Sequence, residues 1–151
     1  MNIRNVKPED VNTFIRLYTV SYKGLEEYAY TNKGDIKRYF YWLLSRDPNG
    51  FFIIELNEPI GFIACDANWF SRFEGKVLGE IHELFVHPKY RGRGIGGLLV
   101  NKAIQYAESK GRKIIGLWVG DKNFYAKKFY KKMGFIETIF AGKWIRMIKK
   151  I

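Results

Sequence analysis

The sequence has little of what disulfide-bonded, membrane-spanning and metal-binding proteins need. It contains 1 cysteine, 2 histidines and 4 prolines in 151 residues. A single cysteine, Cys65, excludes an internal disulfide and favours a reducing compartment. No apolar run approaches the roughly 20 residues of a membrane helix, and the first residues lack the apolar stretch of a secretory signal. We therefore expect a cytoplasmic protein that does not insert into membranes.

Metal and nucleophile chemistry are also disfavoured. His82, His87 and Cys65 do not have the spacing of metal ligands, so no metal site is predicted. Cys65 follows the apolar run 60–64, which predicts a small buried hydrophobe rather than a nucleophile. His87 is next to Pro88 in a predicted loop, where we expect it to face solvent.

The apolar content is sufficient for one folded core. Hydrophobic residues make up 47% of the chain and aromatic residues 17%, far from the composition of disordered segments. The length is that of one ordinary domain, and no repeat or low-complexity linker divides it. We predict a single domain over residues 1–151.

Charge is distributed unevenly along the chain, whose net charge is +11. Residues 1–75 contain 9 Lys and Arg against 10 Asp and Glu, whereas residues 76–151 contain 17 against 5. The basic second half therefore either meets an anion or keeps a solvated face. Nucleic acid and a phosphorylated cofactor both fit this pattern.

Hydrophobic periodicity predicts a mixed α/β domain. The expected elements are a strand at 3–6, a helix that begins at Pro8, a helix at 35–44, strands at 51–56, 60–66 and 77–86, a helix from Ile95 to Ala107, a strand at 114–119, a helix between Asn123 and Gly134, and strands at 135–140 and 143–148. The second half thus alternates strand, helix, strand and helix.

A glycine-rich turn separates the strand that ends at Val86 from the following helix. It runs Arg91-Gly92-Arg93-Gly94-Ile95-Gly96-Gly97. Glycines let backbone N–H groups crowd onto an anion, and the helix N-terminus adds a partial positive charge. A pyrophosphate is the expected occupant, with Lys89, Arg91 and Arg93 near enough to neutralise it.

Two other phosphate motifs fit less well. Gly92, Gly94 and Gly97 match the dinucleotide pattern G-x-G-x-x-G, but the loop 87–91 separates them from the strand, and no acid stands about 20 residues on to hold a ribose. A nucleotide P-loop is excluded because no Gly-Lys-Ser/Thr follows.

The turn resembles the R/Q-x-x-G-x-G/A motif of the GNAT N-acetyltransferase superfamily. A second block, 123–135, is similar to that superfamily's N-x-x-A-x-x-F-Y-x-K-x-G-F pattern, at the expected distance downstream. The matching residues are Asn123, Ala126, Phe129, Tyr130, Lys132, Gly134 and Phe135. The resemblance implies an α/β (α+β) fold with a mostly antiparallel central sheet of six to seven strands flanked by about four helices.

The resemblance also implies acetyl-CoA as cosubstrate. Backbone amides of 91–97 would hold the pyrophosphate, 84–86 would pair with the pantetheine arm, and Asn123 would contact that arm while Ala126 leaves room for it. The full set of implied cofactor residues is Leu84, Phe85, Val86, Arg91, Gly92, Arg93, Gly94, Ile95, Gly96, Gly97, Asn123, Ala126, Tyr130 and Lys132.

The implied reaction is direct attack of an amine on the thioester, with backbone N–H groups of the central strand stabilising the oxyanion. Tyr130 stands where many similar proteins carry a tyrosine that protonates the departing thiolate. A base is also needed, because an alkylamine has a pKa near 10.4.

The candidates for the base are Glu80, His82 and Glu83. Strand alternation separates Glu83 from the other two unless a bulge shifts the parity. Some relatives place the base on the next strand instead, where this chain has Trp118.

Two alternatives and the acceptor stay open. A basic nucleic-acid-binding module is the strongest rival to the enzyme, and a non-catalytic acyl-CoA-binding protein is a further alternative. The acceptor could be a small amine, a peptide N-terminus or a lysine, and homodimers are frequent among similar proteins. Residues that could line an acceptor site, or equally be solvated acids and core aromatics, are Glu26, Glu27, Asp35, Tyr22, Tyr28, Tyr30, Tyr39, Tyr41 and Trp42.

Overall fold

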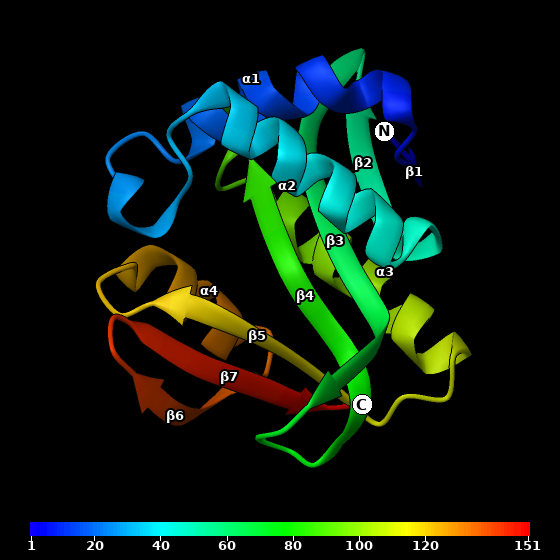
Figure 1. Ribbon diagram of the computed structural model, residues 1–151, viewed down its shortest axis with the longest axis vertical. Coiled ribbons are helices and arrows are strands. Elements are labelled where there is room, and N and C mark those ends of the chain that lie inside the picture. The colour runs from blue at the N-terminus through cyan, green and yellow to red at the C-terminus, as the bar shows by residue number, and fades with distance from the viewer.

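A twisted seven-stranded sheet with helices on both faces forms the body of the protein (Figure 1). The computed structural model describes all residues 1–151. Its strands are β1 (Asn2–Asn5), β2 (Phe51–Leu56), β3 (Glu58–Ser71), β4 (Lys76–Val86), β5 (Ile114–Gly120), β6 (Ile136–Ala141) and β7 (Trp144–Lys150). Its α-helices are α1 (Val11–Ser21), α2 (Lys33–Arg46), α3 (Ile95–Ser109) and α4 (Phe124–Lys132).

The strand order is β1-β2-β3-β4-β5-β7-β6, and every neighbouring pair is antiparallel except β4 and β5. The prediction of a mostly antiparallel mixed sheet with about four helices is therefore confirmed. Antiparallel hairpins join β2 to β3, β3 to β4 and β6 to β7, whereas the parallel pair requires α3 as its crossover.

The single parallel contact is short, and it shapes the functional site. β4 and β5 pair only at Gly79–Ile81 with Ile115–Leu117. Beyond these residues β4 continues to Val86 and β5 to Gly120 without pairing with each other, and the two strands diverge (Figure 1). The sheet is thus split in its middle.

Each face of the sheet carries its own core. On one face Phe14 of α1 and Phe40 of α2 pack with Phe62 and Phe85. On the other, α3 and α4 pack against strand residues such as Ile63 and Ile115. Both cores are fully buried, so the sheet is held between two helical layers.

Local signals set most helix ends. Asn32 caps α2 by accepting from Gly34 N at 2.8 Å and Asp35 N at 3.3 Å, so this helix begins before the predicted Asp35. Gly111 and Gly134 end α3 and α4 with φ of 77° and 94°, a region that favours glycine. Cys65 is buried, as predicted.

Further details differ from the sequence predictions. The first helix begins at Val11 and not at Pro8, because Pro8–Asp10 forms a separate turn of 3-10 helix. β3 extends to Ser71 instead of ending at Asp66, because its distal part pairs with the start of β4. A single turn of 3-10 helix, Glu26–Tyr28, was not predicted. His87 is half-buried and its ring accepts a hydrogen bond from the Lys89 amide at 3.0 Å.

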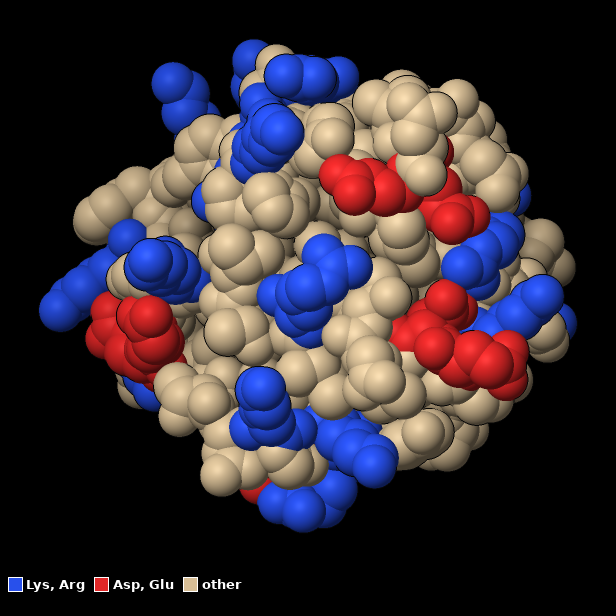
Figure 2. Space-filling view, turned by 90° about the horizontal axis from the view of Figure 1, so that it is seen from above, with Lys and Arg blue, Asp and Glu red and all other residues tan.

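Surface charge is mixed. Seen from above, basic side chains are spread over most of the face and acidic ones gather in a few groups (Figure 2). No helix combines the length and apolar character required to cross a membrane.

Candidate active site

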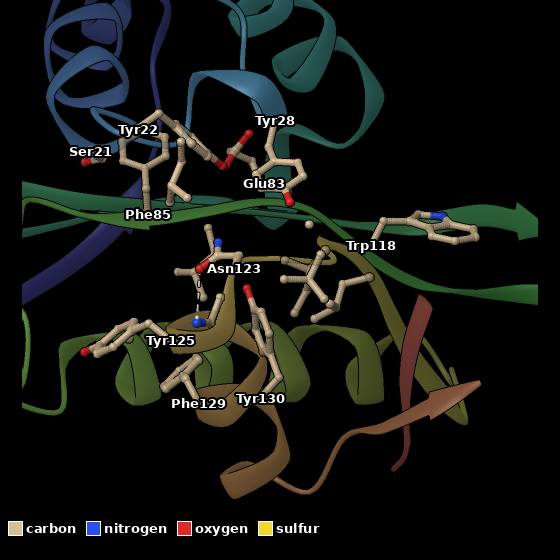
Figure 3. Close-up of a pocket in the computed structure, with 18 of the residues that line it drawn as sticks. Ser21, Tyr22, Tyr28, Glu83, Phe85, Trp118, Asn123, Tyr125, Phe129 and Tyr130 are labelled. Atoms are coloured by element: carbon tan, nitrogen blue, oxygen red, sulfur yellow. Dashed lines mark hydrogen bonds between the residues drawn. The ribbon is translucent and has the colours of Figure 1, made fainter. Parts of the chain in front are cut away.

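A cavity of about 1270 Å³ occupies the split between β4 and β5. Its walls come from the end of α1, the segment 25–30, β4, the glycine turn, β5, α4 and the β6–β7 turn. These segments are far apart in the sequence, and the divergence of the two strands brings them around one space (Figure 3). A deep cavity at a break in a sheet is a common place for a ligand.

The glycine turn forms one end of the cavity. Gly92 and Gly94 have φ of 76° and 78°, and Gly94 precedes the first residue of α3. A Cβ at either position would meet no protein atom within 4 Å, so the backbone here faces open space. Gly96 packs on the ring of Phe129, which a Cβ would approach to 3.1 Å, and this contact brings α4 against α3.

The two arginines of the turn do different things. Arg91 lines the cavity, but its guanidinium donates to the carbonyl oxygens of Val86 at 3.2 Å and Ser21 at 2.8 Å. Arg93 lies over the ring of Tyr90 at 5.3 Å and does not line the cavity. All the other predicted cofactor residues, including Lys132, line it.

Helix α4 presents Asn123 and Tyr130 to the cavity (Figure 3). Asn123 caps the helix, as predicted, by accepting from Ala126 N at 3.3 Å. Tyr130 is buried, and its hydroxyl points toward the space between the strands. Burial and the nearby carboxylate of Glu83 raise the pKa of Tyr130, which keeps the phenol protonated at neutral pH.

A bulge in β4 turns the side chain of Glu83 toward helix α2. Ala64 pairs with Glu83 and Cys65 with Ile81, so His82 has no partner on β3. The parity shift considered from the sequence is therefore present. Consequently His82 and Glu83 both face α2: His82 meets Trp42, and Glu83 meets Tyr39.

Glu83 is buried between two phenols. Tyr39 donates to one carboxylate oxygen at 2.9 Å, and Tyr22, the residue after α1, donates to the other. Burial raises the pKa of Glu83 to about 7, although these two hydrogen bonds lower it in part. The carboxyl group can thus gain and lose a proton at neutral pH.

Glu80, three residues before Glu83, forms a buried ion pair with Arg146. Arg146 of β7 donates to its two oxygens at 2.8 and 2.9 Å, and also to Glu74 at 2.9 Å. All three side chains are more than nine-tenths buried. Gly116 leaves room for the guanidinium, because a Cβ there would lie 2.5 Å from Arg146 Nη2.

His82 is also engaged. Its Nε2 lies 3.0 Å from Asp66 Oδ2, and Asp66 in turn accepts from Arg46 at 2.7 Å. Its ring packs edge-on against Trp42 and Trp69, at 4.9 and 4.8 Å between centroids. Of the three candidate bases, Glu83 alone lacks a charged partner.

Aromatic side chains surround the end of the cavity away from the glycine turn. The ring of Tyr28 lies against Gly120, and its hydroxyl donates to Asp121 at 2.6 Å. Trp144 meets the same ring at 5.4 Å. The segment 25–30 thus crosses from α1 to the far wall, and local sequence carries no signal for these contacts.

The candidate acceptor residues divide between cavity and surface. Those that line the cavity are Tyr22, Glu27, Tyr28, Tyr30 and Tyr39. Those outside it are Glu26, Asp35, Tyr41 and Trp42. Trp118 also lines it, with Phe73 edge-on to its ring at 5.2 Å and the Arg146 guanidinium over the ring at 5.3 Å.

The model of the acetyltransferase (GNAT) family matches residues 12–135. The chain belongs to the GNAT family. This confirms the resemblance and favours a GNAT acetyltransferase over a nucleic-acid-binding module. The match includes the glycine turn and the whole of α4.

Archaeal relatives of this GNAT protein are named N-acetyltransferases. One from Methanocaldococcus jannaschii, named as uncharacterized, is 49% identical over 150 residues, which is 99% of this chain and 66% of the relative. The chain thus spans just under two thirds of that relative's length. Another, from Archaeoglobus fulgidus, is 54% identical over 131 residues, or 86% of this chain and 89% of the relative.

Solved structures share the fold along the whole chain. A crystal structure from Pyrococcus horikoshii has a TM-score of 0.89 at 36% identity and covers 99% of this chain and 98% of its own. The PaiA N-acetyltransferase of Thermoplasma acidophilum, solved in complex with coenzyme A, has a TM-score of 0.81 at 24% identity, with coverage of 99% and 98%. The second likeness concerns the fold alone.

Proposed function

We propose that this GNAT protein is an acetyl-CoA-dependent N-acetyltransferase in which Glu83 is the base and Tyr130 the acid. The observation that supports this most directly is the placing of these two groups. Glu83 on β4 and Tyr130 on α4 face the same cavity from opposite sides (Figure 3). Their environments differ, since Glu83 titrates near pH 7 and Tyr130 stays protonated.

The residues of the glycine turn fit a pyrophosphate. Gly92 and Gly94 adopt left-handed backbone angles with open space beside them, and α3 begins at the next residue, Ile95. Backbone N–H groups and the helix N-terminus would hold the phosphates, while β4 beyond Ile81 keeps an unpaired edge for an extended arm. When bound, acetyl-CoA supplies the acetyl group as a thioester. The CoA complex of the Thermoplasma relative is consistent with this cofactor.

Glu83 would take the proton that the acceptor amine must lose. A base is most effective when its pKa lies near the working pH, and burial brings Glu83 to about 7. Its two phenol partners hold both oxygens in place. Glu80 is less suited because Arg146 occupies both of its oxygens.

Tyr130 would give its phenolic proton to the leaving sulfur. Transfer forms the amide C–N bond and breaks the C–S bond, and the ammonium form of the acceptor loses two protons. Glu83 takes the first, which frees the nitrogen to attack, and the second leaves the nitrogen after attack and replaces, through solvent, the proton that Tyr130 gives to the thiolate. The acceptor itself is proposed only as an amine that enters between the aromatic side chains of Tyr28, Tyr30 and Tyr39, which line the far end.

Isothermal titration with acetyl-CoA tests the cofactor site. Gly94→Glu strains a residue at φ 78° and puts a negative charge where the phosphates would lie. We expect at least about a 100-fold loss of affinity, since juxtaposed like charges cost several kcal/mol. Gly111→Glu is the matched control, because Gly111 has φ 77° and open space but lies at the far end of α3.

Wild-type and Gly111→Glu proteins should bind alike. Failure of folded wild-type protein to bind either acetyl-CoA or CoA would refute the proposed function. Equal binding by Gly94→Glu would refute the role of the turn.

A further inference from the structure

Arg91 connects the glycine turn to the acceptor side of the cavity. Its guanidinium donates to the carbonyl of Val86, the last residue of β4, and to that of Ser21, the last residue of α1. Ser21 Oγ donates to the same Val86 carbonyl at 3.4 Å. A cation at the end of a helix satisfies carbonyls that have no partner within the helix and complements the helix dipole.

Tyr22, the residue after Ser21, contacts the proposed base Glu83. Tyr22 donates to Glu83, and its ring packs on Tyr18 at 4.6 Å and on Phe85 at 6.3 Å. Figure 3 shows Ser21 and Tyr22 together above the cavity, on the same side as Glu83 and opposite Tyr130. Contacts therefore run without a break from the turn through Arg91 to the end of α1 and on to Glu83.

We propose that Arg91 is a positioning residue, whose two hydrogen bonds hold the end of α1 where Tyr22 can donate to Glu83. The inference rests on the proposed function, because it assigns Arg91 to the side of the base. It differs from the usual expectation for an arginine in a phosphate-binding turn, since the guanidinium is already occupied by protein carbonyls.

The groups that face Glu83 are phenols from three helices. They are Tyr18 of α1, Tyr22 directly after it, Tyr39 of α2 and Tyr130 of α4, each with its pKa raised in part by the Glu83 charge. Only Tyr22 and Tyr39 donate hydrogen bonds to the carboxylate. Loosening the Tyr22 bond should therefore raise the titration midpoint of Glu83.

The titration of Glu83 can be measured directly by NMR, so this test of Arg91 requires no acceptor amine. Its side-chain carboxyl carbon would be followed by NMR in ¹³C-glutamate-labelled full-length protein between pH 5 and 9, with Glu83→Gln to assign the signal. A hydrogen bond to a charged group contributes about 1.5–3 kcal/mol, so Tyr22→Phe should raise the midpoint by about 1 pH unit or more. We expect Arg91→Gln to raise the Glu83 midpoint by about half a pH unit, because this substitution would weaken the hydrogen bond from Tyr22 without removing it.

Arg93→Gln is the matched control. It removes the same charge from the same turn, but Arg93 lies over Tyr90 and does not contact α1. It should leave the midpoint unchanged apart from the loss of a distant charge. Arg91→Lys keeps the charge and can reach only one carbonyl at a time, so it should fall between wild type and Arg91→Gln, and it provides a second variant if Arg91→Gln is unstable.

The double variant decides the route. If Arg91 acts through Tyr22, then Arg91→Gln combined with Tyr22→Phe shifts the midpoint no further than Tyr22→Phe alone. Fully additive shifts, or equal shifts for Arg91→Gln and Arg93→Gln, would overturn the proposal. CoA binding by each protein is measured in a separate titration. Failure of the wild-type protein to bind CoA would count against the proposed function, whereas the Glu83 midpoints test the role of Arg91.

Discussion

The two halves of β4 each contain a buried glutamate, and the two glutamates have different side-chain partners. Glu80 lies where β4 pairs with β5, and a buried arginine from β7 binds both of its oxygens. Glu83 lies just past the point where the strands separate, and its side-chain partners are two neutral phenols. The residues are three positions apart and equally enclosed, yet their partners differ completely.

This difference shows how one strand can supply a carboxylate paired with a buried cation and another surrounded by neutral groups. A charged partner offsets the cost of burying an anion and stabilises its charge, whereas neutral donors offset only part of that cost. Glu83 therefore titrates near pH 7. The bulge at His82 is what turns Glu83 toward the helices that carry its phenol partners.

Removing Glu80 should act mainly on the free energy of unfolding. Glu80→Ala leaves Arg146 buried with Glu74 as its remaining carboxylate, and breaking a buried ion pair costs about 3–5 kcal/mol. We expect a loss of about 3 kcal/mol, because Glu74 stays. Urea denaturation followed by circular dichroism would measure it, with exposed Glu108→Ala on α3 as the control.

If Glu80→Ala left the free energy of unfolding unchanged and abolished the pH dependence of activity, Glu80 rather than Glu83 would be the base.

Glu83→Gln should instead reduce activity. Loss of a positioned base lowers the rate by about 10²–10⁴-fold, and we expect about 10²–10³-fold for kcat/KM of the amine. Because Glu83 must be deprotonated to accept a proton, the ratio of wild-type to variant activity should rise with pH up to about 7 and then level off. Release of CoA thiol with a panel of alkylamines would give this profile.

Dividing by the variant removes the contribution of the amine's own ionisation. A ratio that stays constant from pH 5 to 9 would show that Glu83 is not the base.

Tyr130→Phe should have the smallest effect of the three. It removes the proposed acid but keeps the ring packed between Phe129 and Phe135. We expect about a 100-fold loss of kcat, the lower end of the usual range for a positioned acid, with unaltered affinity for acetyl-CoA by calorimetry and unaltered thermal stability. A variant as active as wild type would assign the proton transfer to another group or to water.

The cofactor side of the site could be predicted because its features are local. Gly92 and Gly94 need only their own backbone angles, and Asn123 caps a helix that begins at the next residue. The helix and strand pattern followed from periodicity in the same way. The ends of α2 and β3 were less accurate, since a cap at Asn32 and pairing with β4 extended them.

The acceptor side depends on contacts that periodicity does not encode. Tyr22 and Tyr39 reach Glu83 across 61 and 44 positions of sequence. Arg91 reaches Ser21 across 70 positions. Nothing near Tyr28 in the sequence indicates that it meets Asp121.

The sequence by itself thus determined the family, the central sheet with its helices and the turn for a phosphate, because each depends on residue type, spacing and local backbone freedom. Only the tertiary structure decided which glutamate pairs with an arginine, which one lies between two phenols, and what the turn arginine holds. The physical reason is that the state of a buried charge is set by its neighbours in space, and here a bulge and the separation of two strands choose those neighbours.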